Sequence, residues 1–578
     1  MATLHTEPPS GSIRAQDDQP RTAPEASAQD LAGKGRATAS KPKKRFVGKS
    51  TGPSGSGAKG SPSSPRGILH TSVPPEILQD SLLNEAIAQN LPSNYQFEMH
   101  KTIWNIRKWD CKMVGLQMPE GLLMWACILS DIIERFTSAQ TVILGDVTYG
   151  ACCIDDYTAL ALGCDMLVHY GHSCLVPIDV TTIRTLYVFV EISIDSEHLV
   201  RTIRRNFPSN RDDFLREVVH QQHDGSAQGP EATPIGTVIA GRRRIEGSQP
   251  EKKPTAVELE NGGTSADLAT VGQEHTRLAL VSTIQFSAAL NKLKEDLSAG
   301  LVLDGKPTDT EQEQSGSTVA HYDPNVDLDS GVYSVSVPRS KPLSPGEILG
   351  CTAPRLKDVD AILYLADGRF HLEAIMIANP TVPAFRYDPY SKKLTREYYD
   401  HEEMRAVRGT AVTTAKASLP GDASQTVWGV VLGTLGRQGS LRQMEAILRQ
   451  LDTYGEDTGT SNRIPYMPIL LSELSPAKLS LFNDGSQGNI TTFIQTSCPR
   501  LSIDWGYAFE RPLLSPYEAA VVLGRARGWD DNVEDDTGSM ANSAIRGVYP
   551  MDFYEAGSVW ATSRLKGRDT VWPLQIAV

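Results

Sequence analysis

Short apolar runs alternate with helical patterns along most of this chain, and this alternation limits the possible folds more than any other feature of the sequence. The apolar runs at residues 113–114, 141–144 and 166–170 are separated by stretches with helical spacing of apolar residues, such as residues 122–133. Short β runs that alternate with helices predict a parallel sheet covered by helices. In such sheets, ligands bind at the carboxyl ends of the strands.

The same alternation returns twice more along the chain. A second round starts at residues 186–192, and a third starts at residues 427–434. Further apolar runs of these two rounds lie at residues 278–284, 361–366, 467–471 and 491–498. The sequence therefore predicts an α/β protein with three repeated Rossmann-like units, whose parallel sheets are arranged around a pseudo-threefold axis.

Composition suggests where the units begin and end. The first 70 residues are rich in Ser, Gly, Pro, Ala and Lys and poor in large apolar residues, so we expect a disordered tail. Two stretches inside the second unit show no sustained apolar period, and we expect them to be disordered surface insertions. The expected parts are a tail at 1–70, units at 71–182, 183–388 and 389–545, insertions near 221–275 and 304–340, and a C-terminal tail at 546–578.

Charge and cysteine content narrow the class of protein. The formal net charge of −13 argues against direct nucleic-acid binding, which needs a surplus of Lys and Arg. The sequence contains no run of about 18 apolar residues, the length that a membrane-spanning helix needs. Its first residues also lack the apolar segment of a secretory signal. Eight cysteines in 578 residues are too sparse for a disulfide scaffold, so we expect a cytoplasmic protein.

Each of the three rounds carries a cysteine just after an apolar run. These residues are Cys152, Cys351 and Cys498, and Cys153 is an alternative to its neighbour. Three thiolates that converge on one point suit an iron–sulfur cluster and leave one of four irons without a protein ligand. The alternative is that each cysteine is a small buried apolar side chain. The sequence has no Cys-x-x-Cys pair, which argues against zinc.

A glycine-rich turn in the third round is a candidate anion site. Gly436 and Gly439 enclose Arg437 and Gln438 ahead of an expected helix, whose N-terminus and amides could hold a carboxylate. The alternative is a plain turn between a strand and a helix. Arg500, two residues after Cys498, could form a bidentate bond with the same carboxylate or could cap the neighbouring unit.

Five motifs together resemble one known family. They are Tyr149-Gly-Ala-Cys-Cys-Ile-Asp-Asp156, His169-Tyr-Gly-His-Ser-Cys174, Gly346-Glu-Ile-Leu-Gly-Cys-Thr-Ala-Pro354, Gly433-Thr-Leu-Gly-Arg-Gln-Gly439 and Ser497-Cys-Pro-Arg-Leu-Ser-Ile-Asp504. In this order, and over residues 90–525, they are similar to the family of first subunits of the diphthamide biosynthesis enzyme. The resemblance implies a [4Fe–4S] cluster held by Cys152, Cys351 and Cys498.

The resemblance also implies a reaction and its participants. The 3-amino-3-carboxypropyl group of S-adenosylmethionine would be transferred as a radical to a histidine of translation elongation factor 2. Gly436, Arg437, Gln438 and Arg500 would then bind the cofactor. A related second subunit and an electron-donor protein are the implied partners. Two alternatives are a noncatalytic subunit that relays electrons or acts as a scaffold, and an enzyme like quinolinate synthase, which also has three repeats and three cysteines.

Overall fold

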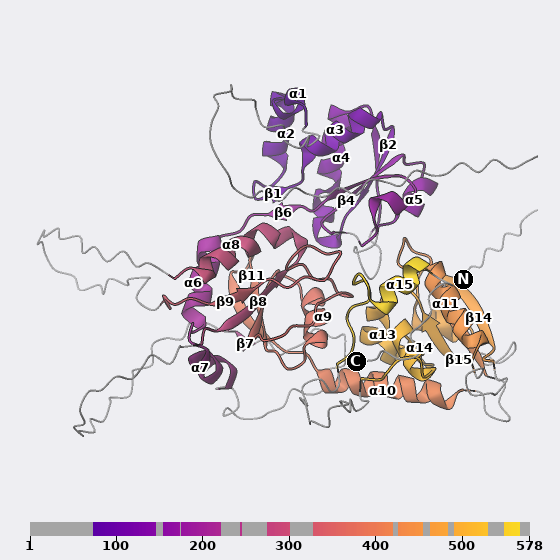
Figure 1. Ribbon diagram of the computed structural model, residues 1–578. Coiled ribbons are helices and arrows are strands. Elements are labelled where there is room, and N and C mark those ends of the chain that lie inside the picture. The colour runs from indigo at the N-terminus through magenta and orange to yellow at the C-terminus, as the bar shows by residue number, and fades with distance from the viewer. Residues whose placement is uncertain are drawn as a thin grey trace, which may run out of the picture. The chain divides into compact units, whose positions relative to one another are not determined.

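The computed structural model in Figure 1 describes most of the chain after the first 72 residues. The described residues are 73–145, 154–173, 175–220, 243–244, 274–300, 328–419, 426–454, 463–483, 490–529 and 548–566. The expected N-terminal tail and most of the insertion expected near 221–275 lie outside these ranges. Among the described helices, none combines the length and the apolar character needed to cross a membrane.

The first sheet has four parallel strands in the spatial order β3-β2-β4-β5. The strands are β2 (Met113–Gln117), β3 (Gln140–Ile143), β4 (Met166–Tyr170) and β5 (Arg184–Val188). The accompanying helices are α1 (Pro75–Leu78), α2 (Ser81–Asn90), α3 (Met99–Trp109), η1 (Glu120–Trp125), α4 (Ala126–Phe136), α5 (Asp156–Ala161) and η2 (Ile178–Val180). Beside this sheet, β1 (Tyr95–Gln96) pairs antiparallel with β6 (Glu191–Ile192).

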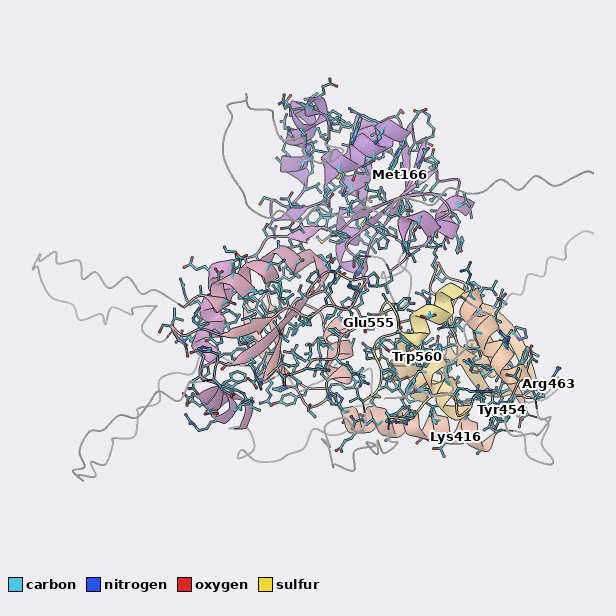
Figure 2. All side chains as sticks on the ribbon, viewed as in Figure 1. Met166, Lys416, Tyr454, Arg463, Glu555 and Trp560 are labelled. Atoms are coloured by element: carbon cyan, nitrogen blue, oxygen red, sulfur yellow. The ribbon has the colours of Figure 1, made fainter. Side chains whose placement is uncertain are left out.

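Apolar side chains cover both faces of the first sheet. Met166 of β4, labelled in Figure 2, is buried in a cluster with residues of α3 and α4. The next residue, Leu167, points to the other face and packs with Ile154 and with Ala159 of α5. In Figure 1, α3 and α4 lie on the opposite side of β2 from α5. Burial on both faces explains why these strands read as continuous apolar runs rather than alternating ones.

The second sheet combines parallel and antiparallel strands. Its parallel part has the order β9-β8-β10-β11, and β12 and β7 extend it antiparallel beyond β11. The strands are β7 (Arg243–Arg244), β8 (Arg277–Ser282), β9 (Ser334–Ser336), β10 (Ala361–Leu365), β11 (Ala384–Asp388) and β12 (Lys393–Glu397). The helices are α6 (Ser196–Asn206), α7 (Arg211–Phe214), η3 (Leu215–His220), η5 (Ile284–Phe286), α8 (Ser287–Ser298) and α9 (Phe370–Ala378).

The third sheet is parallel, with the order β14-β13-β15-β16. Its strands are β13 (Val427–Gly433), β14 (Tyr466–Leu471), β15 (Ile490–Gln495) and β16 (Leu513–Leu514). The helices are α10 (His401–Ala417), α11 (Leu441–Asp452), α12 (Pro476–Ser480), α13 (Pro499–Trp505), η7 (Gly506–Ala508), α14 (Pro516–Val522) and α15 (Val559–Lys566). Ser440 caps α11 by accepting a 3.3 Å hydrogen bond from the Gln443 amide, which ends the glycine-rich turn.

The parallel strands of the three sheets share one order. If the strands of each are numbered along the chain, the first sheet, the parallel part of the second and the third all read 2-1-3-4. The expectation of a mixed α/β fold with parallel sheets is therefore confirmed.

The structure corrects several expected boundaries. The run at 186–192 does not open the second unit, because β5 pairs with β4 of the first sheet. The third unit does not begin at 389, because β12 pairs with β11 of the second sheet. The insertion expected near 304–340 ends earlier, since β9 pairs with β8 and the preceding Tyr333 is buried. Polar and apolar residues alternate around β9, as is typical of an edge strand. This alternation is too short to predict a strand from the sequence.

The C-terminal segment described here is also part of the fold rather than a tail. Tyr549, Met551 and Phe553 are buried, and Trp560, labelled in Figure 2, packs its ring 5.6 Å from that of Tyr517 in α14. Residues 548–566 therefore help to form the core of the third unit.

Candidate functional site

Cys498 lies in a turn at the carboxyl end of the third sheet. It follows β15 by three residues and is the N-cap residue of α13. Its side chain is partly exposed and lines a pocket of about 220 Å³. Burial of most of its surroundings raises the pKa of the Cys498 thiol to about 11, and the Arg500 amide and charge oppose this increase to a smaller extent. A metal that binds here would displace the thiol proton, as metals do at cysteine sites.

A buried glutamine at the end of β15 builds the Cys498 turn. The Gln495 side-chain amide donates to the Cys498 carbonyl oxygen at 3.0 Å and to Ser502 Oγ at 3.0 Å. Its Oε1 accepts from the Ser497 amide at 2.7 Å. These three bonds join the end of the strand to the start of α13, so the backbone on both sides of Cys498 is fixed by one side chain.

The pocket is formed by loops at the carboxyl ends of the third sheet. Leu435 and Gln438 come from the turn after β13, and Ser497 and Cys498 come from the turn after β15. The segment after β14 supplies Ser472, Glu473, Leu474, Ser475 and Pro476, and residues of and beyond α13 supply Leu501, Trp505 and Phe509. The lining thus combines apolar side chains with a few polar groups beside the thiol, which is typical of a small-molecule site.

Cys351 lies in a tight turn of the second unit. The Leu349 and Thr352 backbones exchange hydrogen bonds of 3.0 and 3.2 Å, which places Gly350 and Cys351 at the tip of the turn. A Cβ on Gly350 would collide with the ring of Phe370, so this position requires glycine. Cys351 is buried in an apolar cluster that also contains Leu175 of the first unit.

Cys152 and Cys153 lie outside the described residues, but the segment that follows them is firmly held. The Asp155 amide donates to Gln117 Oε1 at 3.0 Å, and Gln117 lies at the carboxyl end of β2. The Asp155 side chain then accepts from the Thr158 amide at 3.0 Å and caps α5. This segment therefore lies at the carboxyl edge of the first sheet.

The glycine-rich turn of the third unit contacts this segment of the first unit. Gly436 adopts a φ of +54°, and a Cβ there would lie 3.1 Å from the Ile154 carbonyl oxygen. The Arg437 amide donates to that oxygen at 3.2 Å. The Arg437 guanidinium forms bonds of 2.6 and 2.7 Å with the carboxylate of Asp156, and a third, of 3.0 Å, to the Val180 carbonyl.

The carboxylate of Asp156 is ionised despite being buried. Burial alone would raise its pKa, but hydrogen bonds from Arg437 and Thr182 bring the pKa below its usual value. Arg437 also stacks over the Tyr157 ring, 4.5 Å from its centroid. The expected role of Arg437 as a cofactor ligand is therefore not supported. Its guanidinium instead links the third unit to Asp156 and Val180 of the first unit.

Arg500 likewise connects two units and does not line the pocket. Its nitrogens bond Asp504, the Phe370 carbonyl oxygen and Glu373, with Nη–oxygen distances of 2.7 Å to the last two. The side chain is almost fully buried. The geometry favours the second alternative raised for this residue, that it caps the neighbouring unit. Of the four expected cofactor-binding residues, Gln438 is the one whose side chain lines the pocket.

The first and second units also meet through loops that follow parallel strands. Ser173 Oγ donates to Glu347, and the Gln285 side-chain amide donates to the Gly171 carbonyl. The rings of His172 and His371 lie edge to face, 5.8 Å apart. Burial lowers the pKa of His172 to about 4 and that of His371 to about 3, so both imidazoles are neutral near pH 7.

The two candidate cysteines among the described residues, Cys351 and Cys498, do not occupy equivalent places in their sheets. Cys351 lies between the second and third parallel strands, β9 and β10, and Cys152 has the same place in the chain between β3 and β4. Cys498 instead follows the third strand, β15. Cys498 thus follows an apolar run, as expected, but its place in the strand order differs from that of Cys152 and Cys351.

Several residues that build the site were not predicted, notably Gln495, Gln117 and Phe370. Gln495 and Gln117 share a signal that was present in the sequence. Each is a polar residue at the carboxyl end of an otherwise apolar strand, the place where a side chain can bond the following loop. Phe370 carried no such signal, since its ring contacts Gly350 from a different segment of the chain.

Comparisons with known proteins agree on one family. The family model of diphthamide synthesis proteins matches residues 118–231 and 256–534. A relative from Aspergillus fumigatus is 43% identical over 530 residues, which cover 89% of this chain and 90% of the relative. A human relative is 42% identical over 508 residues, covering 87% of this chain and 85% of its own. Both are named 2-(3-amino-3-carboxypropyl)histidine synthase subunit 1.

Among solved structures, the chain is similar to Dph2 from Pyrococcus horikoshii, which was crystallised with a 4Fe-4S cluster. That likeness has a TM-score of 0.46 and 18% sequence identity, and it covers 75% of this chain and 91% of the archaeal one.

Proposed function

Since the chain belongs to the family of diphthamide synthesis proteins, we propose that it is the catalytic iron–sulfur subunit of a 2-(3-amino-3-carboxypropyl)histidine synthase. This enzyme is a transferase that moves the 3-amino-3-carboxypropyl group from S-adenosylmethionine to a histidine of translation elongation factor 2. Besides family membership, one structural observation carries the proposal. Cys498 lines a pocket large enough for part of a small molecule, at the carboxyl ends of a parallel sheet.

We propose Cys152, Cys351 and Cys498 as the ligands of a [4Fe–4S] cluster. Cys351 and Cys498 fit this role, because each lies in a turn that a neighbouring side chain holds in place, Phe370 for the first and Gln495 for the second. Thiolates are the preferred ligands of iron–sulfur clusters, and three of them leave one iron open to a substrate. When bound and reduced, the cluster would supply the electron that cleaves the sulfur–Cγ bond of S-adenosylmethionine.

A pseudo-threefold arrangement of the units would bring the three cysteines together. Two observations support it. The parallel strands of the three sheets have the same order, and segments that follow the strands, either loops or the first turns of helices, touch in all three pairs. The first and third units meet at Arg437 and Asp156, the second and third at Arg500 and Glu373, and the first and second at Ser173 and Glu347.

We propose that the turn with Gly436 and Gln438 binds S-adenosylmethionine through its methionine carboxylate. Gln438 is largely buried and lines the pocket beside Cys498. Its own backbone is held in place, because the Gln438 carbonyl oxygen accepts a 2.7 Å hydrogen bond from Arg564. A residue whose backbone is held in this way can present its side chain to the cofactor from a fixed position. Contacts of this kind, and not the chemistry of the cluster, are what a protein contributes to a cofactor reaction.

The proposed partners follow from the reaction. The relatives are named as subunit 1, which supports a second, related subunit. Elongation factor 2 would be the protein substrate, and an electron-donor protein would reduce the cluster. We propose a cytoplasmic location, where this translation factor acts.

The test is anaerobic purification of the chain together with its second subunit, followed by electron paramagnetic resonance with and without S-adenosylmethionine. We expect a signal of a reduced [4Fe–4S] cluster that changes when the cofactor is added, and transfer of the 3-amino-3-carboxypropyl group to elongation factor 2. A cluster signal that S-adenosylmethionine leaves unchanged, in a complex that still modifies the factor, would assign this chain to electron relay instead of catalysis.

A further inference from the structure

Arg500 is a buried cation whose contacts reach two different units. Its side chain is 1% exposed, and its three nitrogens all donate to oxygen atoms of the protein. Nε donates to the Asp504 carboxylate at 2.8 and 3.0 Å, Nη1 to the Phe370 carbonyl oxygen at 2.7 Å, and Nη2 to Glu373 Oε2 at 2.7 Å. Such a fork of bonds fixes both the position and the orientation of the guanidinium.

On the third-unit side, these contacts tie Arg500 to Cys498. Arg500 is the second residue of α13, and Cys498 is the N-cap residue of the same helix. Asp504, one helical turn later, pairs with Arg500 and keeps its side chain against the helix. The guanidinium therefore moves together with the Cys498 turn.

On the second-unit side, the contacts lead to Cys351. Phe370 and Glu373 belong to the first turn of α9, which follows β10. The Arg500 guanidinium lies over the Phe370 ring, 4.4 Å from its centroid. The same ring packs so closely on Gly350 that no Cβ would fit there. Gly350 is the neighbour of Cys351 at the tip of its turn.

These contacts form one continuous path, from Cys498 through Arg500 and Phe370 to Gly350 and Cys351. We propose that Arg500 is a positioning residue that holds the Cys351 and Cys498 turns at one fixed separation. The inference rests on the proposed function, because it concerns two of the three proposed cluster ligands. Arg500 acts here through these turns and does not touch the cofactor.

Arg408 provides a matched control. It is also a fully buried arginine, and it donates to the Glu518 carboxylate at 2.6 and 2.7 Å and to the Leu513 carbonyl oxygen at 2.8 Å. Its bonds join α10 to α14 and β16. A substitution at Arg408 therefore removes a buried fork of bonds of the same kind, and its acceptors, Glu518 and Leu513, lie outside the path between the two cysteines.

The experiment compares Arg500→Lys and Arg408→Lys in the full chain, purified anaerobically with its second subunit. Lysine keeps the charge but cannot form the planar fork, so both variants should lose thermal stability. Of these two variants, we expect only Arg500→Lys to change the electron paramagnetic resonance spectrum of the reduced protein. Its iron should be lost to a chelator about tenfold faster or more, the scale at which residues supporting metal ligands act. Phe370→Leu, which leaves the backbone acceptor for Arg500 in place, should change the same two measurements.

The possible results separate the inference from the proposed function. If Arg500→Lys and Phe370→Leu lose stability like Arg408→Lys but keep the parental spectrum and iron retention, Arg500 has only a structural role and the inference is wrong. A parental spectrum combined with weaker S-adenosylmethionine binding in Arg500→Lys would make Arg500 a cofactor ligand and would also overturn the inference. A parental complex that holds no iron would instead overturn the proposed function.

Discussion

Single residues at this site show which roles a sequence can reveal. Cys351 and Cys498 could be selected because each follows an apolar run, and both lie in loops at the carboxyl ends of strands. Gln438 was selected from its place in a glycine-rich turn, and it lines the pocket. The same turn predicted a binding role for Arg437, and closeness to Cys498 predicted one for Arg500, but both bond carboxylates of distant segments. The identity of a long-range partner is not encoded in local spacing, so the sequence could not predict the partner of Arg437 or decide between the two alternatives for Arg500.

The cysteines allow a direct test at the residue scale. We expect Cys351→Ala and Cys498→Ala each to remove most of the iron from the anaerobically purified protein, because no other side chain type supplies a comparably soft ligand at these positions. Cys127→Ala is the control, since Cys127 is exposed on α4. Iron analysis of the three variants tests whether these cysteines are cluster ligands. Parental iron content in both Cys351→Ala and Cys498→Ala would contradict the cluster assignment.

The proposed cofactor contact of Gln438 gives a second residue-scale prediction. Gln438→Ala should weaken S-adenosylmethionine binding by about tenfold, or ~1.4 kcal/mol, in line with loss of a hydrogen bond to a charged group. The cluster spectrum should not change. Gln443→Ala is the control, because Gln443 is also buried but does not line the pocket, and its side chain bonds Ser563 and Arg564. Titration of the anaerobic variants with S-adenosylmethionine measures their affinities. If Gln438→Ala binds it as tightly as the parental protein, the methionine carboxylate binds elsewhere.

At the scale of helices and strands, the period of the apolar residues predicted most of the parallel strands. The buried strand β10 is an apolar run without alternation, as expected for a strand covered on both faces. The antiparallel β12, Lys-Leu-Thr-Arg-Glu, was not predicted, because three of its five residues are charged. Its charges are accommodated by tertiary pairing, in which Glu397 bonds Arg386 at 2.9 Å. Local patterns cannot show this kind of compensation.

The turn that carries Cys351 leads to a prediction at this scale. Gly350→Ala should destabilise the protein by about 1–3 kcal/mol, because its Cβ would overpack the Phe370 ring. Gly409→Ala is the matched control, since Gly409 lies within α10 and a Cβ there would meet no atom within 4 Å. That substitution should stabilise α10 by up to about 1 kcal/mol. Thermal unfolding of both variants tests this, and similar shifts in the same direction would disprove it.

For the whole molecule, the sequence predicted three α/β units but not their limits. The composition of β5 resembles that of the strands that come after it. Only its pairing with β4 therefore assigns it to the first sheet. The C-terminal segment was mistaken for a tail because its buried aromatic residues are scattered without a period. Unit boundaries in a repeated fold are therefore set by pairing across the chain, which composition does not record.

Two truncations test these limits. Deletion of residues 1–65 should leave the thermal midpoint and the activity almost unchanged, because their composition offers little apolar surface to bury. Deletion of residues 546–578 should prevent stable folding. It removes Tyr549, Phe553 and Trp560 from the core, and each such side chain contributes roughly 1.5–3 kcal/mol. Circular dichroism melting curves distinguish the two, and a large loss of stability in the first variant would show that the N-terminal residues dock on the fold.

The placement of Cys498 after the third strand has an evolutionary consequence. In a chain built from three copies of one ancestral unit, identical copies would each present a thiol in the loop after the second strand. In the third sheet that loop follows β14, and its residues from Ser472 to Pro476 form a wall of the pocket instead. Under the proposed function, the third unit would thus hold its metal ligand and a wall of the pocket on two separate loops.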